Sequence, residues 1–229
     1  EELAAVEAVL QNGSFEFEGI FTHFATADEA DTTQLTKQIR KFHRLVDELS
    51  VKPAHVHYSN SAYALWHGAG ESAIVRYGIG IYGINPSNGD LALKDEAALT
   101  PALRWETEMV KVKKLEAGDT VSYGATYTAD EPQWVATLPV GYADGYIRAY
   151  NKGEVLVDGV RCPIVGRICM DQCMIRLPHE FPVGTTVTLL GKDGDEEITA
   201  IELAKRSETI AYEVLCIISD RVKRVYINE

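Results

Sequence analysis

Apolar residues in the first part of the chain alternate between strand-like and helix-like spacing. Segment 15–24 (FEFEGIFTHF) favours a strand, while segment 32–49 repeats apolar residues every three or four positions, as one face of a helix does. Shorter β-rich segments follow at 53–58 and 74–81. Because crossovers between strands of one sheet are right-handed, strand, helix and strand in this order predict parallel pairing.

After about Asp90 the spacing changes to short strands separated by turns. We predict strands at 109–112, 134–138, 154–157, 186–190 and 221–227, with turn sequences such as EAGD and GKDGD between them. One helical segment, 199–206, interrupts the series and has Thr199 as its expected N-cap. This part of the chain is therefore expected to be a mostly antiparallel β-domain.

The turn-rich segment 85–90 (NPSNGD) marks the expected joint between two domains. The fold class predicted is α/β plus β, with the C-terminal part of a (β/α)8 barrel at 1–90 and a C-terminal β-domain at 91–229. Three parallel strands are too few to close a barrel of eight. The chain also opens inside an apparent helix, EELAAVEAVL, without Met. We therefore expect a missing N-terminal segment.

Composition narrows the function classes. Hydrophobic residues make up 46% and charged residues 24%, as in ordinary soluble globular proteins, and the net charge is −12. An acidic surface repels nucleic acid and anionic lipid, and no apolar run is long enough to span a bilayer. None of the four cysteines forms a CxxC pair, so we expect no metal site and reduced thiols in a cytoplasmic protein.

Candidate chemistry in the first domain lies where strands end. His23 follows the first strand, although a lone histidine there is more often structural. Asn60 and Ser61 stand where a strand meets a helix, which suits either a phosphate or simple N-capping. Arg76 inside a barrel needs an acceptor, and Gly78 allows backbone to approach a ligand closely.

In the second domain three short strings combine tyrosines, glycines and charges. They are VSYGATY at 121–127, PVGYADG at 139–145 and GRICMD at 166–171. Taken singly, each is as well explained by a surface turn or a core tyrosine. Their significance comes from their order along the chain.

Together these residues resemble the pattern of bacterial alanine racemases. The resemblance rests on His23, Asn60-Ser61, RYGI at 76–79, SYGATY, GYADG, GRICMDQ and IAYE at 210–213, and it covers essentially the whole chain. It implies a pyridoxal-phosphate (PLP) enzyme of fold type III, with a β/α barrel, a β-domain and a head-to-tail homodimer whose subunits share their active sites.

The resemblance also implies a role for each matching residue. The catalytic set is Tyr123 as one of two bases, with His23 and Arg76 as a relay behind it, and the second base is a Schiff-base lysine in the missing segment. The cofactor-binding set is Asn60, Ser61, Arg76, Gly78, Ile79 and Tyr212, with Arg76 against the pyridine nitrogen. The Met170 backbone contacts the substrate carboxylate, and Asp28, Tyr142, Arg148, Arg167 and Ile210 form a narrow access corridor.

The expected function is PLP-dependent interconversion of L-alanine and D-alanine, which supplies D-alanine for cell-wall peptidoglycan. Without the segment that carries the lysine, this chain alone is expected to be inactive. Two alternatives remain: a racemase of serine or another small amino acid, and an inactive fragment that only self-associates.

Overall fold

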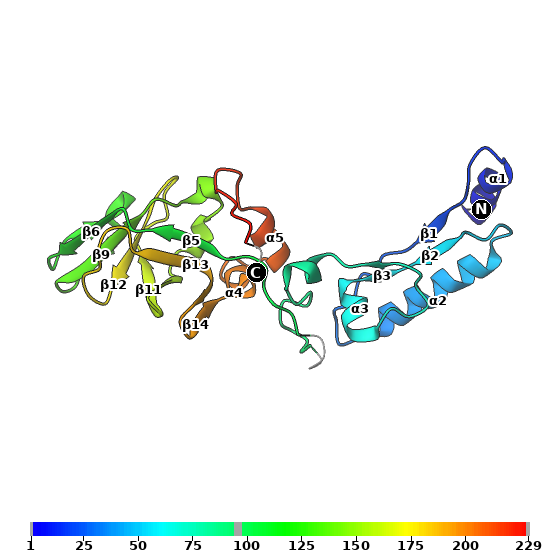
Figure 1. Ribbon diagram of the computed structural model, residues 1–229, viewed down its shortest axis with the longest axis horizontal. Helices are drawn as coiled ribbons and strands as arrows, with labels where there is room; N and C mark the ends of the chain where they lie inside the picture. The colour runs from blue at the N-terminus through cyan, green and yellow to red at the C-terminus, as the bar shows by residue number, and fades with distance from the viewer. Residues whose placement is uncertain (1, 94–97, 228–229) are drawn as a thin grey trace. The chain divides into compact units, whose positions relative to one another are not determined.

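The computed structural model describes residues 2–93 and 98–227. The chain divides into two compact units, Glu1–Ala102 and Leu103–Glu229, each of which can be followed in Figure 1. The units separate after Ala102, further along the chain than the boundary predicted after residue 90. The segment before Ala102 returns to the first unit, because the Ala102 N–H donates to the Tyr82 carbonyl at 3.1 Å.

The first unit contains two pairs of parallel strands. Strand β1 (Gly19–Phe21) pairs with β2 (His55–His57), and β3 (Ser59–Asn60) pairs with β4 (Val75–Arg76). Its described residues also form α1 (Glu2–Gln11), α2 (Thr33–Glu48), α3 (Ser61–His67) and the 3₁₀ turn η1 (Ile79–Tyr82). Parallel pairing is confirmed, but the strand expected over 74–81 is wrong beyond Arg76.

Glycines explain why the predicted strand gives way to a tight turn. Gly83 lies in the left-handed region with φ 72°, where side chains other than glycine are strained. A Cβ at Gly80 would lie 2.4 Å from the Tyr77 ring, so glycine here lets that ring pack against the turn. The turn begins directly after Gly78 and therefore places the backbone of this segment beside the end of β4.

An aromatic cluster holds α2 against β1 and β2 (Figure 1). Phe24, Phe42, Tyr58 and Tyr63 are buried, and the Tyr58 and Tyr63 rings meet edge to face with centroids 5.4 Å apart. Burying one such side chain contributes roughly 1.5–3 kcal/mol. The cluster is the core of this unit and fixes the strand ends beyond it.

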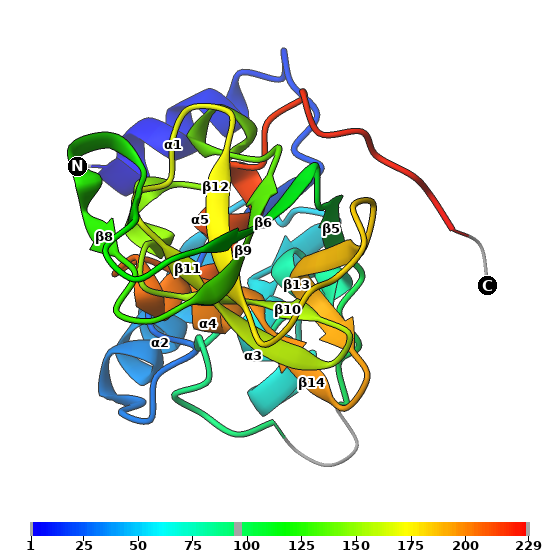
Figure 2. The same cartoon turned by 90° about the vertical axis from the view of Figure 1, so that its left-hand side faces the viewer.

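The second unit is an antiparallel sheet in the order β14-β13-β10-β11-β12-β9-β6, with β5 also paired to β13. Strands β12, β9 and β6 can be followed as neighbours in Figure 2. The bounds are β5 (Trp105–Glu108), β6 (Lys111–Leu115), β9 (Gln133–Leu138), β10 (Glu154–Val157), β11 (Val160–Val165), β12 (Cys173–Leu177), β13 (Thr186–Asp193) and β14 (Glu196–Ile198). A two-stranded ribbon is formed by β7 (Thr120–Val121) and β8 (Tyr127–Thr128).

Short helical turns complete this unit. They are η3 (Tyr123–Ala125), η4 (Tyr142–Asp144), η5 (Arg148–Tyr150), α4 (Ala200–Arg206) and α5 (Ala211–Cys216). The predicted cap of α4 is confirmed, because the Thr199 hydroxyl accepts from the Glu202 N–H at 3.0 Å. Within the described residues, no helix of either unit is long and apolar enough to cross a membrane.

Two of the predicted strands need correction. The strand expected at 109–112 begins at Lys111. The one expected at 221–227 does not form within its described residues, although Val225 and Tyr226 suit a strand. Those two side chains are 70% and 91% exposed, and the Arg224 side chain donates to the Ser219, Val222 and Ile218 carbonyls.

Two tyrosines attach the segment 142–151 to the sheet. Tyr146 is fully buried with its ring 5.7 Å from Trp105 and 5.1 Å from Tyr150. Burial raises the pKa of Tyr146 well above its ordinary value and that of Tyr150 to about 12, so both stay neutral in the core. Segment 142–151 is therefore anchored by apolar packing.

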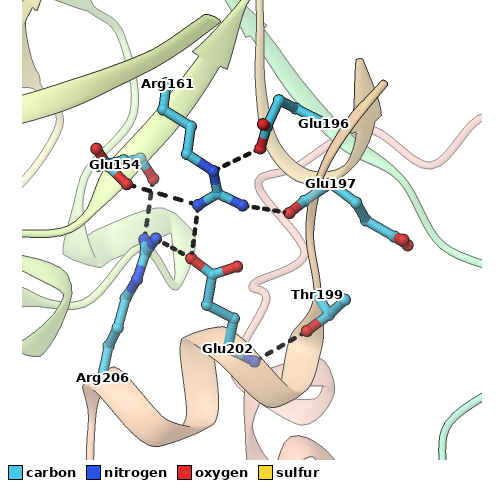
Figure 3. A network of polar contacts seen from close by, with 7 residues as sticks. All are labelled: Glu154, Arg161, Glu196, Glu197, Thr199, Glu202 and Arg206. Carbon is cyan, nitrogen blue, oxygen red and sulfur yellow. Dashed lines mark hydrogen bonds and ion pairs between the residues drawn. The ribbon is translucent and has the colours of Figure 1, made fainter. Parts of the chain in front are cut away.

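A polar network joins α4 to the sheet edge (Figure 3). The Arg161 guanidinium contacts Glu196 at 2.6 Å, Glu202 at 3.0 Å, Glu154 at 3.5 Å and the Glu197 carbonyl at 2.7 Å. The hydrogen bonds that Arg161 donates to Glu202 and Glu196 raise its pKa further above its already high value. One cation thus links strands β10, β11 and β14 to α4.

Arg161→Ala should lower the free energy of unfolding by about 1–3 kcal/mol, because three carboxylates lose their common donor. Urea unfolding followed by tryptophan fluorescence measures this change. Arg176→Ala is the matched control, since Arg176 is exposed on β12, and its effect should stay within about 0.5 kcal/mol. Equal effects of the two substitutions would show that the network does not stabilise the unit.

Candidate active site

Arg76 lies at the end of β4 and is held at several points. Its Nη1 donates to His57 Nδ1 at 2.7 Å, its Nη2 donates to the Thr22 carbonyl at 2.8 Å, and Nη2 lies 3.3 Å from His23 Nδ1. The guanidinium also lies over the Phe21 ring at 5.1 Å. The predicted acceptors for this arginine are therefore supplied by the ends of neighbouring strands.

The surroundings of Arg76 favour a neutral imidazole at His57. A guanidinium only donates, so His57 Nδ1 must be unprotonated to accept from it. Burial lowers the pKa of His57, and the positive charge of Arg76 lowers it further. Burial also lowers the pKa of Arg76, yet an arginine remains charged at neutral pH.

His57 was not among the residues predicted from the sequence. The signal was present in the string HVH at 55–57, because alternate residues of a strand point to the same side. The sequence did not indicate which histidine of this string faces Arg76.

His23 is placed between two donors. Its Nδ1 faces Arg76, and its Nε2 lies 3.4 Å from Asn60 Nδ2. A neutral imidazole has a single acceptor nitrogen, so His23 can accept from only one of these groups at a time. Asn60 is the N-cap of α3, since its Oδ1 accepts from the Tyr63 N–H at 2.9 Å. The same Asn60 side chain therefore caps α3 and lies beside His23.

Ser61, Gly78 and the start of η1 form a small polar cradle. The buried Ser61 hydroxyl accepts from the Gly78 N–H at 2.8 Å and lies 3.4 Å from the Gly80 N–H. A Cβ built at Gly78 would point into the space 3.8 Å from that hydroxyl. A hydroxyl and backbone N–H groups beside open space are suitable donors for a phosphate, so the residues present fit that group.

The second unit has a hollow of about 800 Å³ that is lined by five of the candidate residues of this unit. Its lining includes Tyr123, Tyr142, Arg167 and Met170, which come from the three strings of the sequence, and Arg148, which follows the second of them. Tyr123 is 76% exposed and Met170 is 54% exposed, so both present their side chains to solvent in this chain.

Close backbone contact joins two of these strings. The Tyr142 and Ala143 N–H groups donate to the Cys169 and Met170 carbonyls, each at 3.0 Å. A Cβ at Gly141 would lie 2.3 Å from the Cys169 carbonyl oxygen, so only glycine permits this approach. The turn that carries Tyr142 is thereby fixed against the segment that carries Met170.

Arg221 supports the contact between these two segments by pairing with an aspartate on each. Arg221 lies 3.4 Å from Asp144 and 2.8 Å from Asp171, while Asp144 also accepts from the Gly141 N–H at 2.9 Å. Arg221 has no role among the predicted site residues. Its position between the two turns became visible only in the folded chain.

Three candidate residues lie outside these two groups. Asp28 lies between β1 and α2 in the first unit, and Ile210 and Tyr212 lie at the start of α5 in the second. None of them is part of the lining of the hollow. Among residues 2–93 and 98–227, the structure has no group of three or more His, Cys, Asp or Glu side chains that could hold a metal ion.

Both units match a known family of proteins. Residues 1–86 match the N-terminal domain of alanine racemase, and residues 102–226 match its C-terminal domain. The two domains belong to one kind of enzyme, and the matches follow each other in the chain as they do there. The chain belongs to the alanine racemase family.

Three proteins illustrate how similar this chain is to its relatives in sequence and structure. An alanine racemase of Latilactobacillus sakei is 53% identical, over 93% of this chain and 56% of its own length. The crystal structure of alanine racemase from E. faecalis has a TM-score of 0.92 and 50% identity, covering 97% of this chain and 59% of that one. A histidine racemase from Leuconostoc mesenteroides has a TM-score of 0.89 and 34% identity, covering 99% and 61%.

The chain thus spans between one half and two thirds of the length of these relatives. Its fold is that of the family, a barrel domain followed by a β-domain, of which the first unit contains part of the barrel.

Arg76→Gln should raise the pKa of His57, because the substitution removes a positive charge and leaves the burial unchanged. A proton NMR titration of the imidazole measures the change, with His57→Gln used to assign the signal. Arg44→Gln is the control, since Arg44 pairs with Glu48 on the exposed side of α2. A pKa of His57 that stays constant or falls in Arg76→Gln would contradict the arrangement described.

Proposed function

We propose that this chain forms the C-terminal part of a PLP-dependent alanine racemase that interconverts L-alanine and D-alanine. The product D-alanine would serve peptidoglycan synthesis, and the enzyme would act in the cytoplasm as a homodimer with shared active sites. The identity of about one half to relatives named alanine racemase supports this proposal. The observation that carries it is the Arg76 guanidinium, held by Thr22 and two imidazoles beside the Ser61 cradle.

The cofactor would be held by residues of this chain. Ser61 and the backbone of Gly78 and Ile79 would bind its phosphate together with Tyr212, and Asn60 would lie beside them. When bound, PLP supplies the electron sink that makes the α-proton of an amino acid acidic. Its lysine would come from a part of the enzyme that is not in this sequence.

Arg76 would face the ring nitrogen of the cofactor. An arginine donates a hydrogen bond there without giving up its proton. The ring nitrogen would then stay unprotonated, which weakens the electron sink and shortens the time in which side reactions such as transamination compete. The three contacts that hold Arg76 serve this role, because they leave the guanidinium little freedom to turn.

Tyr123 would move the proton on one face of the substrate. A racemase needs two opposed bases, and the lysine would serve the other face. A tyrosine in water has a pKa near 10, so a tyrosine that acts as a base needs positive charge or hydrogen bonds nearby. We assign that support to Arg76 and His23 of the partner subunit. The family resemblance implies that these two residues form a relay behind the tyrosine in a shared active site.

Substrate selection would involve the second unit. The Met170 backbone would contact the substrate carboxylate, and Tyr142, Arg148 and Arg167 would line the access corridor with Asp28 and Ile210. A narrow corridor favours small amino acids. Substitutions at these residues should then alter the Michaelis constant.

A different substrate is the second candidate. The histidine racemase has the same fold at 34% identity, so the fold alone does not determine which amino acid is racemised. Serine and other small amino acids are the notable alternatives to alanine. Comparing kcat/KM for L-alanine, L-serine and L-histidine in the full-length protein distinguishes these substrates. If kcat/KM is highest for serine or histidine, that amino acid replaces alanine as the proposed substrate.

Tyr123→Phe in the full-length enzyme should reduce racemisation by about 10²–10⁴-fold, because one of two acid–base groups is lost. Exchange of the α-proton with D₂O should persist better for D-alanine than for L-alanine, since the lysine would still serve its own face. Mass spectrometry of each recovered enantiomer measures the exchange. Equal losses for both enantiomers would mean that Tyr123 is structural or that one base serves both faces.

Mixing two inactive variants should restore part of the activity if the subunits share their sites. Tyr123→Phe combined with a variant of the missing lysine leaves one intact site in each heterodimer. Racemase activity is measured after the subunits have exchanged, and native mass spectrometry verifies that heterodimers form. Heterodimers without activity would contradict the shared site.

A further inference from the structure

The backbone around Tyr123 has an unusual conformation. Ser122, Gly124 and Ala125 all have positive φ values, at 72°, 74° and 47°. For residues other than glycine this region is costly, and it persists only where the surroundings determine the conformation. The conformation of this segment therefore depends on contacts outside it.

One such contact is made by the Ser122 side chain. Its hydroxyl accepts from the Arg167 N–H at 2.9 Å and donates to the Arg167 carbonyl at 3.1 Å. A hydroxyl has one proton and two lone pairs, so both bonds form together. Ser122 thus binds the donor and the acceptor of a single residue in the segment that leads to Met170.

The two segments also approach closely enough to exclude a side chain. A Cβ at Gly166 would lie 2.6 Å from the Ser122 Cβ, and Gly166 itself has φ 74°. On the other side of Tyr123, a Cβ at Gly124 would lie 3.7 Å from the Arg167 guanidinium. Residues of both segments therefore contribute to this close contact.

Tyr123 has little else to orient it. Its side chain is 76% exposed. The backbone, which includes the preceding residue Ser122, consequently sets the Cα–Cβ direction from which the ring extends.

We propose that Ser122 is a positioning residue that holds Tyr123 in a fixed arrangement with the Met170 segment. It acts by clamping the Arg167 backbone, and it makes no contact with substrate. The inference rests on the proposed function, in which Tyr123 moves a proton and the Met170 backbone contacts the carboxylate. Substrate carboxylate and base would then keep their distance through the Ser122 hydroxyl.

The clamp itself can be tested on this chain without cofactor. In Ser122→Ala the Arg167 N–H loses its acceptor, so its hydrogen exchange with D₂O should accelerate by at least about tenfold, which corresponds to about 1.4 kcal/mol. Amide-resolved NMR exchange measures this rate. Thr185→Ala is the control, since its hydroxyl bonds the Pro182 carbonyl away from the hollow and its loss should leave Arg167 unchanged. An unchanged Arg167 rate in Ser122→Ala would overturn the clamp.

The functional part is tested in the full-length protein. Ser122→Ala should lower kcat by up to about 10²-fold with KM nearly constant, as expected when a reacting group is displaced by about 1 Å. Ser122→Gly should lose as much, although it relieves the positive φ, because it also lacks the hydroxyl. Full activity of Ser122→Gly would mean that only backbone conformation matters and would overturn the proposal.

A double-mutant cycle separates this inference from the proposed function. If Ser122 acts through Tyr123, then Ser122→Ala should have little further effect in a Tyr123→Phe background. A large effect in both backgrounds would overturn the positioning role and leave the proposed function intact. If Tyr123→Phe alone has no effect on racemisation, the proposed function fails, while the exchange rate at Arg167 still reports on the clamp.

Discussion

A charged guanidinium that is partly removed from water governs the first unit. Arg76 must find acceptors, because an unpaired charge among apolar side chains is costly. The acceptors at the strand ends are one carbonyl oxygen and one imidazole nitrogen, and a second imidazole lies close by. The aromatic cluster under α2 keeps those strand ends in place, so the packing of this unit and its electrostatics depend on each other.

The second unit satisfies a different constraint. Its candidate residues lie on turns, and turns have little packing of their own. Close backbone approach compensates: Gly141 contacts Cys169, and Gly166 contacts Ser122. Buried Tyr146 and the Arg161 network attach the flanking segments to the sheet. The turns at the hollow are thus held by close backbone approach together with the side-chain contacts of Ser122 and Arg221.

How far the sequence predicts this structure depends on whether a feature is local. Segment 33–48 and the Thr199 cap follow from periodicity and capping, and both are as expected. Segment 221–227 is not a strand within the described residues, where the Arg224 side chain binds the carbonyls of nearby residues. His57 and Ser122 went unrecognised because their partners are 19 and 45 residues away in the chain. The order of the strings indicated the family, whereas the contacts that support each site residue required the fold.

The two constraints imply a division of roles within the proposed enzyme. The first unit presents a cation and a phosphate cradle, whose strength comes from charge and hydrogen bonding. The second presents an exposed hydroxyl, whose proposed role depends on its orientation as well as on the charge near it. A fixed charge acts over several ångströms, but proton transfer requires hydrogen-bond reach. Small displacements of the second unit's turns should therefore impair catalysis more than equal displacements around Arg76, which explains why rigid, glycine-dependent contacts gather around Tyr123 and Tyr142.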